Sequence, residues 1–206
     1  MRDEIKVELD EMTANGVIRE VDEPTDWVSS IVYVRKSNGR LRLCLDPKDL
    51  NKGIMRCHHK TPTSEELMHK LAGSKFFTKL DAKNGYWSVK LDSESQLLTT
   101  FNTPFRRYCF LRMPFGLVMS QDVFQQKMDM ILEGCHGTLT LIDDVIVHGK
   151  TKEEHDGNLR KLMETAQTAG LMFNSDKCAV NKKKIKFFGA VFDENGIHPD
   201  PKKLKK

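Results

Sequence analysis

The segment from Thr140 to Val147 constrains the fold most, because two adjacent carboxylates, Asp143 and Asp144, interrupt an otherwise mostly apolar run. Burying an unpaired carboxylate is costly, so a core strand does not retain two of them without a partner. A tight hairpin avoids this cost, since the flanks become paired strands and both carboxylates face solvent or a cation at the bend. The segment therefore predicts a carboxylate hairpin that binds a hard divalent cation, with an ordinary surface turn as the alternative.

A second acidic position lies upstream of this hairpin. Residues 76–81 form a strand-like run that ends at Asp81, and Gly85 lies in the following loop, before an alternating segment at 87–91. One carboxylate at a strand end and a distant carboxylate pair form the donor set that two-metal phosphoryl transfer needs. In that chemistry one cation activates a hydroxyl and the other holds the triphosphate and the leaving pyrophosphate.

Composition excludes several other classes of protein. The chain has 206 residues and a formal net charge of +4, which is compatible with a polyanionic partner. Its five cysteines are odd in number and never form a C-x-x-C pair, so a disulfide framework or zinc module is not expected. Residues 57–59 (Cys-His-His) are expected to have a loop or structural role rather than to bind a metal ion. No apolar run reaches the roughly 18 residues of a membrane span, and the charged N-terminus does not resemble a signal peptide.

Hydrophobic periodicity predicts an α+β fold. Residues 3–15 have an apolar helical face, and Thr63 to Glu66 form a capping box that begins a helix ending near Gly73. Further helices are expected from an N-cap at Ser120 and over residues 152–169, with Met163 on the apolar face of the second. Strands are expected at residues 28–34, 41–45, 87–91, 171–173 and 185–192.

The chain resembles a known family at four ordered blocks. Residues 80–87 (LDAKNGYW), 113–117 (MPFGL), 142–144 (IDD) and 187–189 (FFG) occur in the order and spacing of the reverse transcriptase domain. The resemblance is greatest to polyproteins of Gypsy-type long-terminal-repeat retrotransposons and extends from near Glu4 to the last residues.

This resemblance implies the fingers and palm of a right-hand polymerase, with an antiparallel palm sheet backed by helices. Residues 1–75 and 91–119 would form the fingers, and residues 76–90 and 120–198 the palm. Residues 199–206 would lead towards a thumb that the chain lacks.

The resemblance also implies roles for individual residues. The catalytic carboxylates would be Asp81, Asp143 and Asp144, with the backbone of Ala82 completing the shell of two Mg²⁺ ions, for which Mn²⁺ could substitute. Asp81 and Asp143 would be the direct metal ligands and Asp144 the more peripheral one. The implied nucleotide-binding residues are Lys36, Arg42, Ala82, Lys83, Asn84, Tyr86, Phe115 and Gly116. The implied primer and template contacts are Leu141, Phe188, Gly189, Gln121 and Gln125.

Two of these roles depend on the side-chain chemistry. An arginine at position 42 could pair the triphosphate bidentately, and the amides of Lys83 and Asn84 would face triphosphate oxygens. The ring of Tyr86 would exclude a ribose 2′-hydroxyl. Without this resemblance, the favoured interpretation of Arg42 is an ordinary exposed charge on a strand, and that of Tyr86 is core packing beside Trp87.

Two positions depart from the family pattern. Leu141 replaces the tyrosine of retroviral members, which affects only a contact with the primer end. Arg106 replaces an expected glycine, and it would be strained by about 1 kcal/mol if the turn requires a positive φ.

The function implied is an RNA-directed DNA polymerase that adds dNTPs to a primer on an RNA or DNA template. It would act in the cytoplasm, in a retroelement particle without membrane contact, with the thumb, connection and RNase H parts of a polyprotein. Two alternatives remain: a catalytically weak nucleic-acid-binding remnant, and a metal-dependent nuclease. The nuclease leaves Tyr86, Arg42 and the bend at residues 115–116 unexplained.

Overall fold

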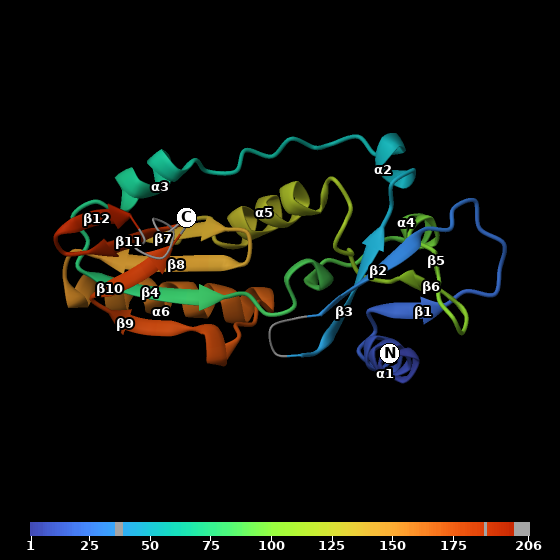
Figure 1. Ribbon diagram of the computed structural model, residues 1–206. Coiled ribbons are helices and arrows are strands. Elements are labelled where there is room, and N and C mark those ends of the chain that lie inside the picture. Colours follow the sequence, from blue (N-terminus) through green and yellow to red (C-terminus); the bar gives the residue numbers. More distant parts are fainter. Residues whose placement is uncertain (36–38, 188, 200–206) are drawn as a thin grey trace. The chain divides into compact units, whose positions relative to one another are not determined.

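A computed structural model describes residues 1–35, 39–187 and 189–199, and the chain divides into two compact units that interleave in sequence (Figure 1). Unit 1 comprises Met1–His58 and Tyr86–Phe124, and unit 2 comprises His59–Gly85 and Gln125–Lys206. These units divide the chain at other positions than the predicted fingers and palm, since residues 59–75 lie in unit 2 and residues 86–90 and 120–124 lie in unit 1. Within the described residues, no helix is both long enough and apolar enough to cross a membrane.

Unit 1 contains short helices and two small antiparallel sheets. Its elements are α1 (Arg2–Ala14), β1 (Ile18–Glu20), β2 (Ser30–Arg35), β3 (Leu41–Asp46), α2 (Leu50–Gly53), α4 (Ser93–Leu98), β5 (Phe101–Asn102) and β6 (Arg107–Phe110). One sheet has the order β1-β6-β5, and β2 and β3 form a hairpin. The predicted face of α1 is confirmed, since Ile5, Leu9 and Met12 are buried.

Unit 2 is built on a four-stranded antiparallel sheet of order β7-β8-β4-β9. Its elements are α3 (Ser64–Leu71), β4 (Phe76–Asp81), β7 (Thr138–Leu141), β8 (Asp144–Gly149), α6 (Lys152–Ala169), β9 (Ala179–Lys182), β10 (Lys184–Phe187), β11 (Ala190–Asp193) and β12 (Gly196–Pro199). Two 3₁₀ turns, η1 (Gly85–Ser88) and η2 (Ser175–Lys177), and helix α5 (Ser120–Ile131) complete the chain. The boundary between the units falls within both η1 and α5.

Both faces of the unit 2 sheet are covered. On one face, Phe77 of β4 and Ile146 of β8 join a buried cluster with α3, β7, β10 and β11. On the other face, the hydroxyl of Thr78 bonds to the buried ring of His155 in α6, at 2.9 Å. Alternate side chains of β4 therefore face opposite layers, as the period of a strand requires, and this alternation fixes the register of β4.

The capping and stop signals were predicted correctly. Thr63 and Glu66 make both hydrogen bonds of the capping box at the start of α3. Helix α6 spans the predicted residues 152–169 and ends at Gly170, whose φ is +69°. However, Met163 is exposed, and Ser120 is the first residue of α5, where its hydroxyl donates to the carbonyl of Pro114.

Three predicted strands were wrong, and one expected strain is absent. Residues 87–91 contain part of η1 and an isolated bridge at Lys90, and residues 171–173 contain only a bridge at Phe173. Residues 185–192 are not one strand but the hairpin of β10 and β11. Arg106 is not among the residues with positive φ, so its turn does not need the expected glycine.

Two glycines of unit 2 should respond oppositely to alanine. A Cβ at Gly149, where β8 meets α6, would lie 2.5 Å from the backbone nitrogen of His155, so Gly149→Ala should cost about 1–3 kcal/mol of unfolding free energy. Gly157→Ala, inside α6 and with nothing within 4 Å, should gain up to about 1 kcal/mol. Urea unfolding of both variants tests this, and equal effects would contradict the packing.

Candidate functional site

The sheet of unit 2 brings two of the predicted carboxylates directly opposite each other. Asp81 is the last residue of β4 and Asp144 the first of β8, and the antiparallel register pairs these two residues. Their side chains are partly buried, with 17% and 31% of the surface exposed. Like charges at paired strand positions repel, so the arrangement needs a cation to offset it.

The third carboxylate, Asp143, lies in the tight turn between β7 and β8. The turn consists of Ile142 and Asp143, and Ile142 has a φ of +54°, which is strained for a β-branched residue. The carbonyl of Asp143 accepts a hydrogen bond from the backbone N–H of Ala82 at 2.7 Å, which ties the turn to the end of β4. Asp144 belongs to β8 rather than to the bend, so the predicted hairpin is confirmed with the bend one residue earlier.

A glycine allows the Asp143 carboxylate to approach the loop after β4. Gly85 has a φ of +47°, and a Cβ there would lie 3.0 Å from Oδ1 of Asp143. A larger residue at position 85 would be strained and would crowd this carboxylate. The glycine noted in the sequence therefore has a local steric function.

Two lysines, which the sequence analysis did not include in the site, neutralise the carboxylates. Nζ of Lys79 donates to Oδ2 of Asp144 at 2.7 Å, and Nζ of Lys177 lies 3.1 and 3.2 Å from the two oxygens of Asp81. Lys79 precedes Asp81 by two residues in the same strand, so the period of two could have indicated it. Lys177 is 96 residues from Asp81, and no sequence pattern links the two.

The donor chemistry of this cluster fits a hard divalent cation, because carboxylate oxygens are the ligands that Mg²⁺ and Mn²⁺ prefer. Cationic groups already contact Asp81 and Asp144. In the part of the chain that the structure describes, no three His, Cys, Asp or Glu side chains are assembled as a metal-binding group. A bound metal ion would therefore have to draw the carboxylates together and compete with the ammonium groups.

Gln125, predicted to contact the template, is instead fully buried in unit 2. Its Oε1 accepts from the backbone N–H of Ile142 at 2.8 Å, and its Nε2 donates to Oγ1 of Thr140 at 2.9 Å. A side chain with no exposed surface cannot contact another molecule, so the template assignment is wrong for this residue in this structure. Gln121 is exposed, and Leu141 packs partly buried against the core of unit 2.

The loop after β4 also differs from expectation at one backbone amide. The N–H of Lys83 donates to the carbonyl of Met172 at 2.8 Å, so it is engaged within unit 2 and not directed at a ligand. Ala82 is buried, and Asn84 is exposed with a φ of +69°. The pairing of residues 81–83 with 172–174 explains why the predicted strand at 171–173 is reduced to a bridge.

In unit 1, the predicted nucleotide-binding side chains form an aromatic cluster. The ring of Tyr86 lies 4.9 Å from that of Phe115 and 5.5 Å from that of Phe124, between centroids. The guanidinium of Arg42, on β3, lies over the Phe115 ring at 5.2 Å. Tyr86 is partly exposed, so it combines packing against Phe115 with an accessible surface.

Gly116, next to Phe115, is required for a close backbone approach. Its φ is +109°, and a Cβ there would lie 2.2 Å from the carbonyl oxygen of Leu45 in β3. The side chain of Asn51 donates to the carbonyl of Gly116 and accepts from the N–H of Val118, at 2.9 and 3.0 Å. The predicted close approach is present, but its partner in this structure is the protein backbone.

The remaining predicted site residues can be described only in part. Lys36 and Phe188 lie outside the described residues, as does the tail from residue 200. Gly189 has a φ of +78° in the turn between β10 and β11.

Comparison with known proteins identifies related sequences. Residues 34–192 match the family model described as reverse transcriptase (RNA-dependent DNA polymerase). An uncharacterized protein of Caenorhabditis elegans is 35% identical over 98% of this chain and 16% of its own length. The retrovirus-related Pol polyprotein from transposon 297 of Drosophila melanogaster is 30% identical over 98% of the chain and 20% of its own length. The chain thus spans a fifth or less of these two relatives.

Solved structures share the fold. The foamy viral protease-reverse transcriptase in complex with double-stranded DNA has a TM-score of 0.89 at 22% identity, over 98% of this chain and 35% of that one. The same viral enzyme in complex with an RNA/DNA hybrid has a TM-score of 0.87 at 22% identity, over 98% of this chain and 27% of that one. The α+β fold predicted from the sequence, with fingers and palm, is confirmed by this similarity.

The Lys177–Asp81 ion pair should compete with a divalent cation. Lys177→Met removes the ammonium group from Asp81, so we expect Mn²⁺ to bind about two- to tenfold more tightly, equivalent to at most about 1.4 kcal/mol. Isothermal titration calorimetry with Mn²⁺ measures this. Lys182→Met, at an exposed lysine of β9, makes the same charge change and should have little effect. Equal affinities in the two variants would show that Lys177 does not occupy the cation position.

Proposed function

Because this chain belongs to the reverse transcriptase (RNA-dependent DNA polymerase) family, we propose that it is the catalytic core of an RNA-directed DNA polymerase. It would add dNTPs to the 3′-hydroxyl of a primer on an RNA or DNA template. The observation that carries the proposal is the pairing of Asp81 with Asp144 at adjacent strand ends, with Asp143 in the turn beside them.

The three carboxylates would hold two Mg²⁺ ions, with Asp81 and Asp143 as direct ligands and Asp144 more peripheral. When bound, such cations supply activation of the primer hydroxyl and neutralisation of charge on the triphosphate. The fixed turn of Ile142 and Asp143 keeps the carboxylates positioned. The partial burial of Asp81 and Asp144 strengthens their interaction with any cation, because screening by water is reduced.

The aromatic cluster of unit 1 supports the nucleotide-binding part of the proposal. Arg42 would pair the triphosphate, and its contact with Phe115 limits the freedom of its guanidinium before a ligand arrives. Tyr86 would lie against the sugar, with its ring braced by Phe115 and Phe124. We assign Arg42 and Phe115 to the fingers, and Tyr86 and the carboxylate site to the palm.

The larger assembly is inferred from the relatives. The matched region of the transposon 297 relative is 20% of a Pol polyprotein, so we propose that this chain acts as part of a Gypsy-type retrotransposon polyprotein. The thumb, connection and RNase H parts would be its partners, within a retroelement particle. The bound nucleic acids of the foamy viral enzyme support a primer and template as ligands.

Removal of one carboxylate charge tests the catalytic proposal. Asp143→Asn should abolish primer extension with Mg²⁺ and leave the melting temperature nearly unchanged, because the change removes a charge and little packing. Asp144→Asn should have a milder effect, as expected for a peripheral ligand. Extension is measured with the chain alone and with a supplied thumb.

Asp176→Asn is the matched control, since it makes the same change at an exposed residue of η2. Extension should continue in this variant at the wild-type rate. Normal extension by folded Asp143→Asn would rule out the proposed catalytic site.

Sugar selection separates a polymerase from a nuclease or a binding remnant. Tyr86→Ala should raise incorporation of ribonucleotides relative to deoxynucleotides by roughly a hundredfold, because it relieves a clash of a few kcal/mol. Single-nucleotide extension with each substrate gives this ratio.

Tyr86→Phe keeps the ring and its contacts with Phe115 and Phe124, so its selectivity should remain that of the wild type. An active Tyr86→Ala variant with unchanged selectivity would refute the proposal that the Tyr86 ring excludes the ribose 2′-hydroxyl. A nuclease predicts no effect on sugar selection at this residue, and a binding remnant gives no incorporation at all.

A further inference from the structure

The geometry points to Gln125 and Asp129 of α5 as positioning residues that hold the carboxylate turn in its strained shape, an inference that rests on the proposed function. Neither residue is one of the three proposed catalytic carboxylates, Asp81, Asp143 and Asp144. Both lie in unit 2 and connect α5 to the hairpin of β7 and β8 through buried and partly buried hydrogen bonds.

The central contact is between Gln125 and the turn itself. Oε1 of Gln125 accepts from the N–H of Ile142, the residue immediately before Asp143, at 2.8 Å. Ile142 has a φ of +54°, a conformation that persists only where the surroundings fix it. The carbonyl of Asp143 is held from the other side by the N–H of Ala82. The turn is therefore held at two consecutive residues by hydrogen bonds from different parts of unit 2.

Asp129 fixes the orientation of the Gln125 amide. Nε2 of Gln125 donates to Oδ1 of Asp129 at 2.9 Å and to Oγ1 of Thr140, also at 2.9 Å. The hydroxyl of Thr140 donates in turn to Oδ1 of Asp129 at 2.6 Å. Because Asp129 offers only acceptors, the NH₂ group of Gln125 must face it, and this leaves Oε1 for the N–H of Ile142.

The second carboxylate oxygen of Asp129 contacts a histidine, which fixes the orientation of Asp129. Oδ2 of Asp129 lies 2.7 Å from Nε2 of His59, in the loop before α3. This contact gives His59, in the Cys-His-His segment, a structural role. His59, Asp129, Gln125 and the N–H of Ile142 thus form a series of hydrogen bonds in which each group orients the next. Loss of one member should therefore loosen the turn.

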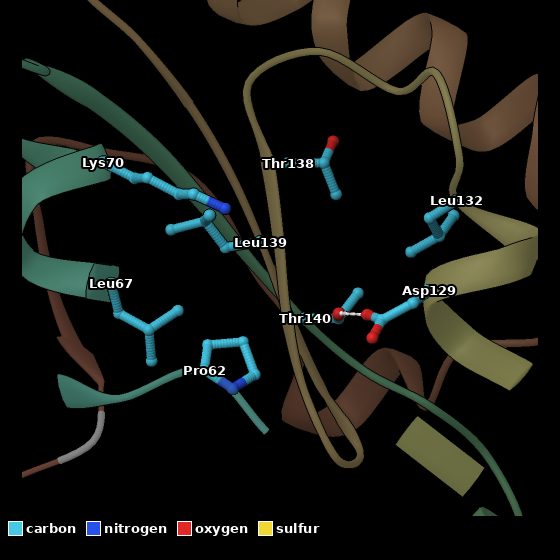
Figure 2. Close-up of a pocket in the computed structure, with 8 residues that line it drawn as sticks. All are labelled: Pro62, Leu67, Lys70, Asp129, Leu132, Thr138, Leu139 and Thr140. Carbon is cyan, nitrogen blue, oxygen red and sulfur yellow. Dashed lines mark hydrogen bonds between the residues drawn. The ribbon is translucent and has the colours of Figure 1, made fainter. Parts of the chain in front are cut away.

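The network borders a cavity that allows it to be tested. Figure 2 shows Asp129 and Thr140, joined by their hydrogen bond, among the side chains that line this cavity of about 230 Å³. An apolar side chain at position 129 would face Leu132 and Leu139 across this space. Asp129→Leu should therefore be accommodated without overpacking, while it removes the acceptor that orients Gln125.

Hydrogen exchange at the amide of Ile142, measured by NMR on the 206-residue chain, tests the network without any metal ion. Gln125→Met keeps the length of the side chain and removes its acceptor, so protection of this amide should fall by at least about tenfold. Asp129→Leu should act in the same direction. Asp129→Asn keeps an acceptor for Gln125 and should stay close to wild type. Gln126→Met, at the exposed neighbour in α5, is the matched control.

Thr140→Val is a second variant for the same exchange measurement if Gln125→Met does not fold, because it preserves the shape of the residue and removes only the hydroxyl. It should also lower the protection of Ile142. Unchanged protection in folded Gln125→Met or Thr140→Val, judged by the melting temperature, would overturn the inference.

Kinetics distinguish positioning from a purely structural role. Folded Gln125→Met and Asp129→Leu should lower kcat for extension about tenfold or more, with KM for the dNTP within about twofold of wild type. Loss of Ile142 protection with unchanged kcat would overturn the positioning role. Failure of the proposed function itself is recognised separately, from continued extension by Asp143→Asn.

Discussion

The pairing of Asp81 with Asp144 is the constraint on which the candidate site of unit 2 depends. The two residues are paired across β4 and β8, where like charges destabilise a sheet. The register that pairs them is set elsewhere, by Phe77 and Ile146, which must both face the cluster with α3 and β10. A slip of one residue would turn these side chains towards α6 and out of this cluster, so hydrophobic packing holds the carboxylates together against their repulsion. The lysines at positions 79 and 177 then offset the remaining charge.

The sequence was informative wherever a local rule decides the structure. The capping box at Thr63, the stop at Gly170 and the carboxylate hairpin each depend on a few neighbouring residues, and all three are present. Residues 87–91 alternate like a strand, but within the described residues they form only an isolated bridge, between Lys90 and Arg112, so tertiary context overrides the pattern. The short segment at 171–173 is not a strand for the same reason, since its bridge, from Phe173, is to Ala82 in the loop after β4.

For the candidate site, the sequence indicated which residues matter better than it indicated which groups they contact. Gly116 was expected to allow a close approach, and the structure supplies one, but the approaching group is the carbonyl of Leu45. Gln125 was expected at the nucleic acid, yet its amide is buried against Thr140 and Ile142. A glutamine at a given helix position does not reveal whether it faces a ligand or a turn, because that depends on segments distant in sequence. Lys177 was missed for the same reason.

The contacts around the carboxylates fall into two classes with different physical consequences. The backbone of the turn is held by two hydrogen bonds, from the N–H of Ile142 to the buried Gln125 and from the N–H of the buried Ala82 to the carbonyl of Asp143, which are costly to break because the buried groups would lose their partners. The charge of Asp81 is offset by a lysine side chain that can leave readily, since Lys177 is 63% exposed and its ammonium can be hydrated by water. A site in which a metal ion must replace a lysine ammonium needs a firmly held backbone and loosely held counter-ions. Rigid counter-ions would exclude a metal ion, whereas a loosely held backbone would lose the geometry each time the counter-ion changed.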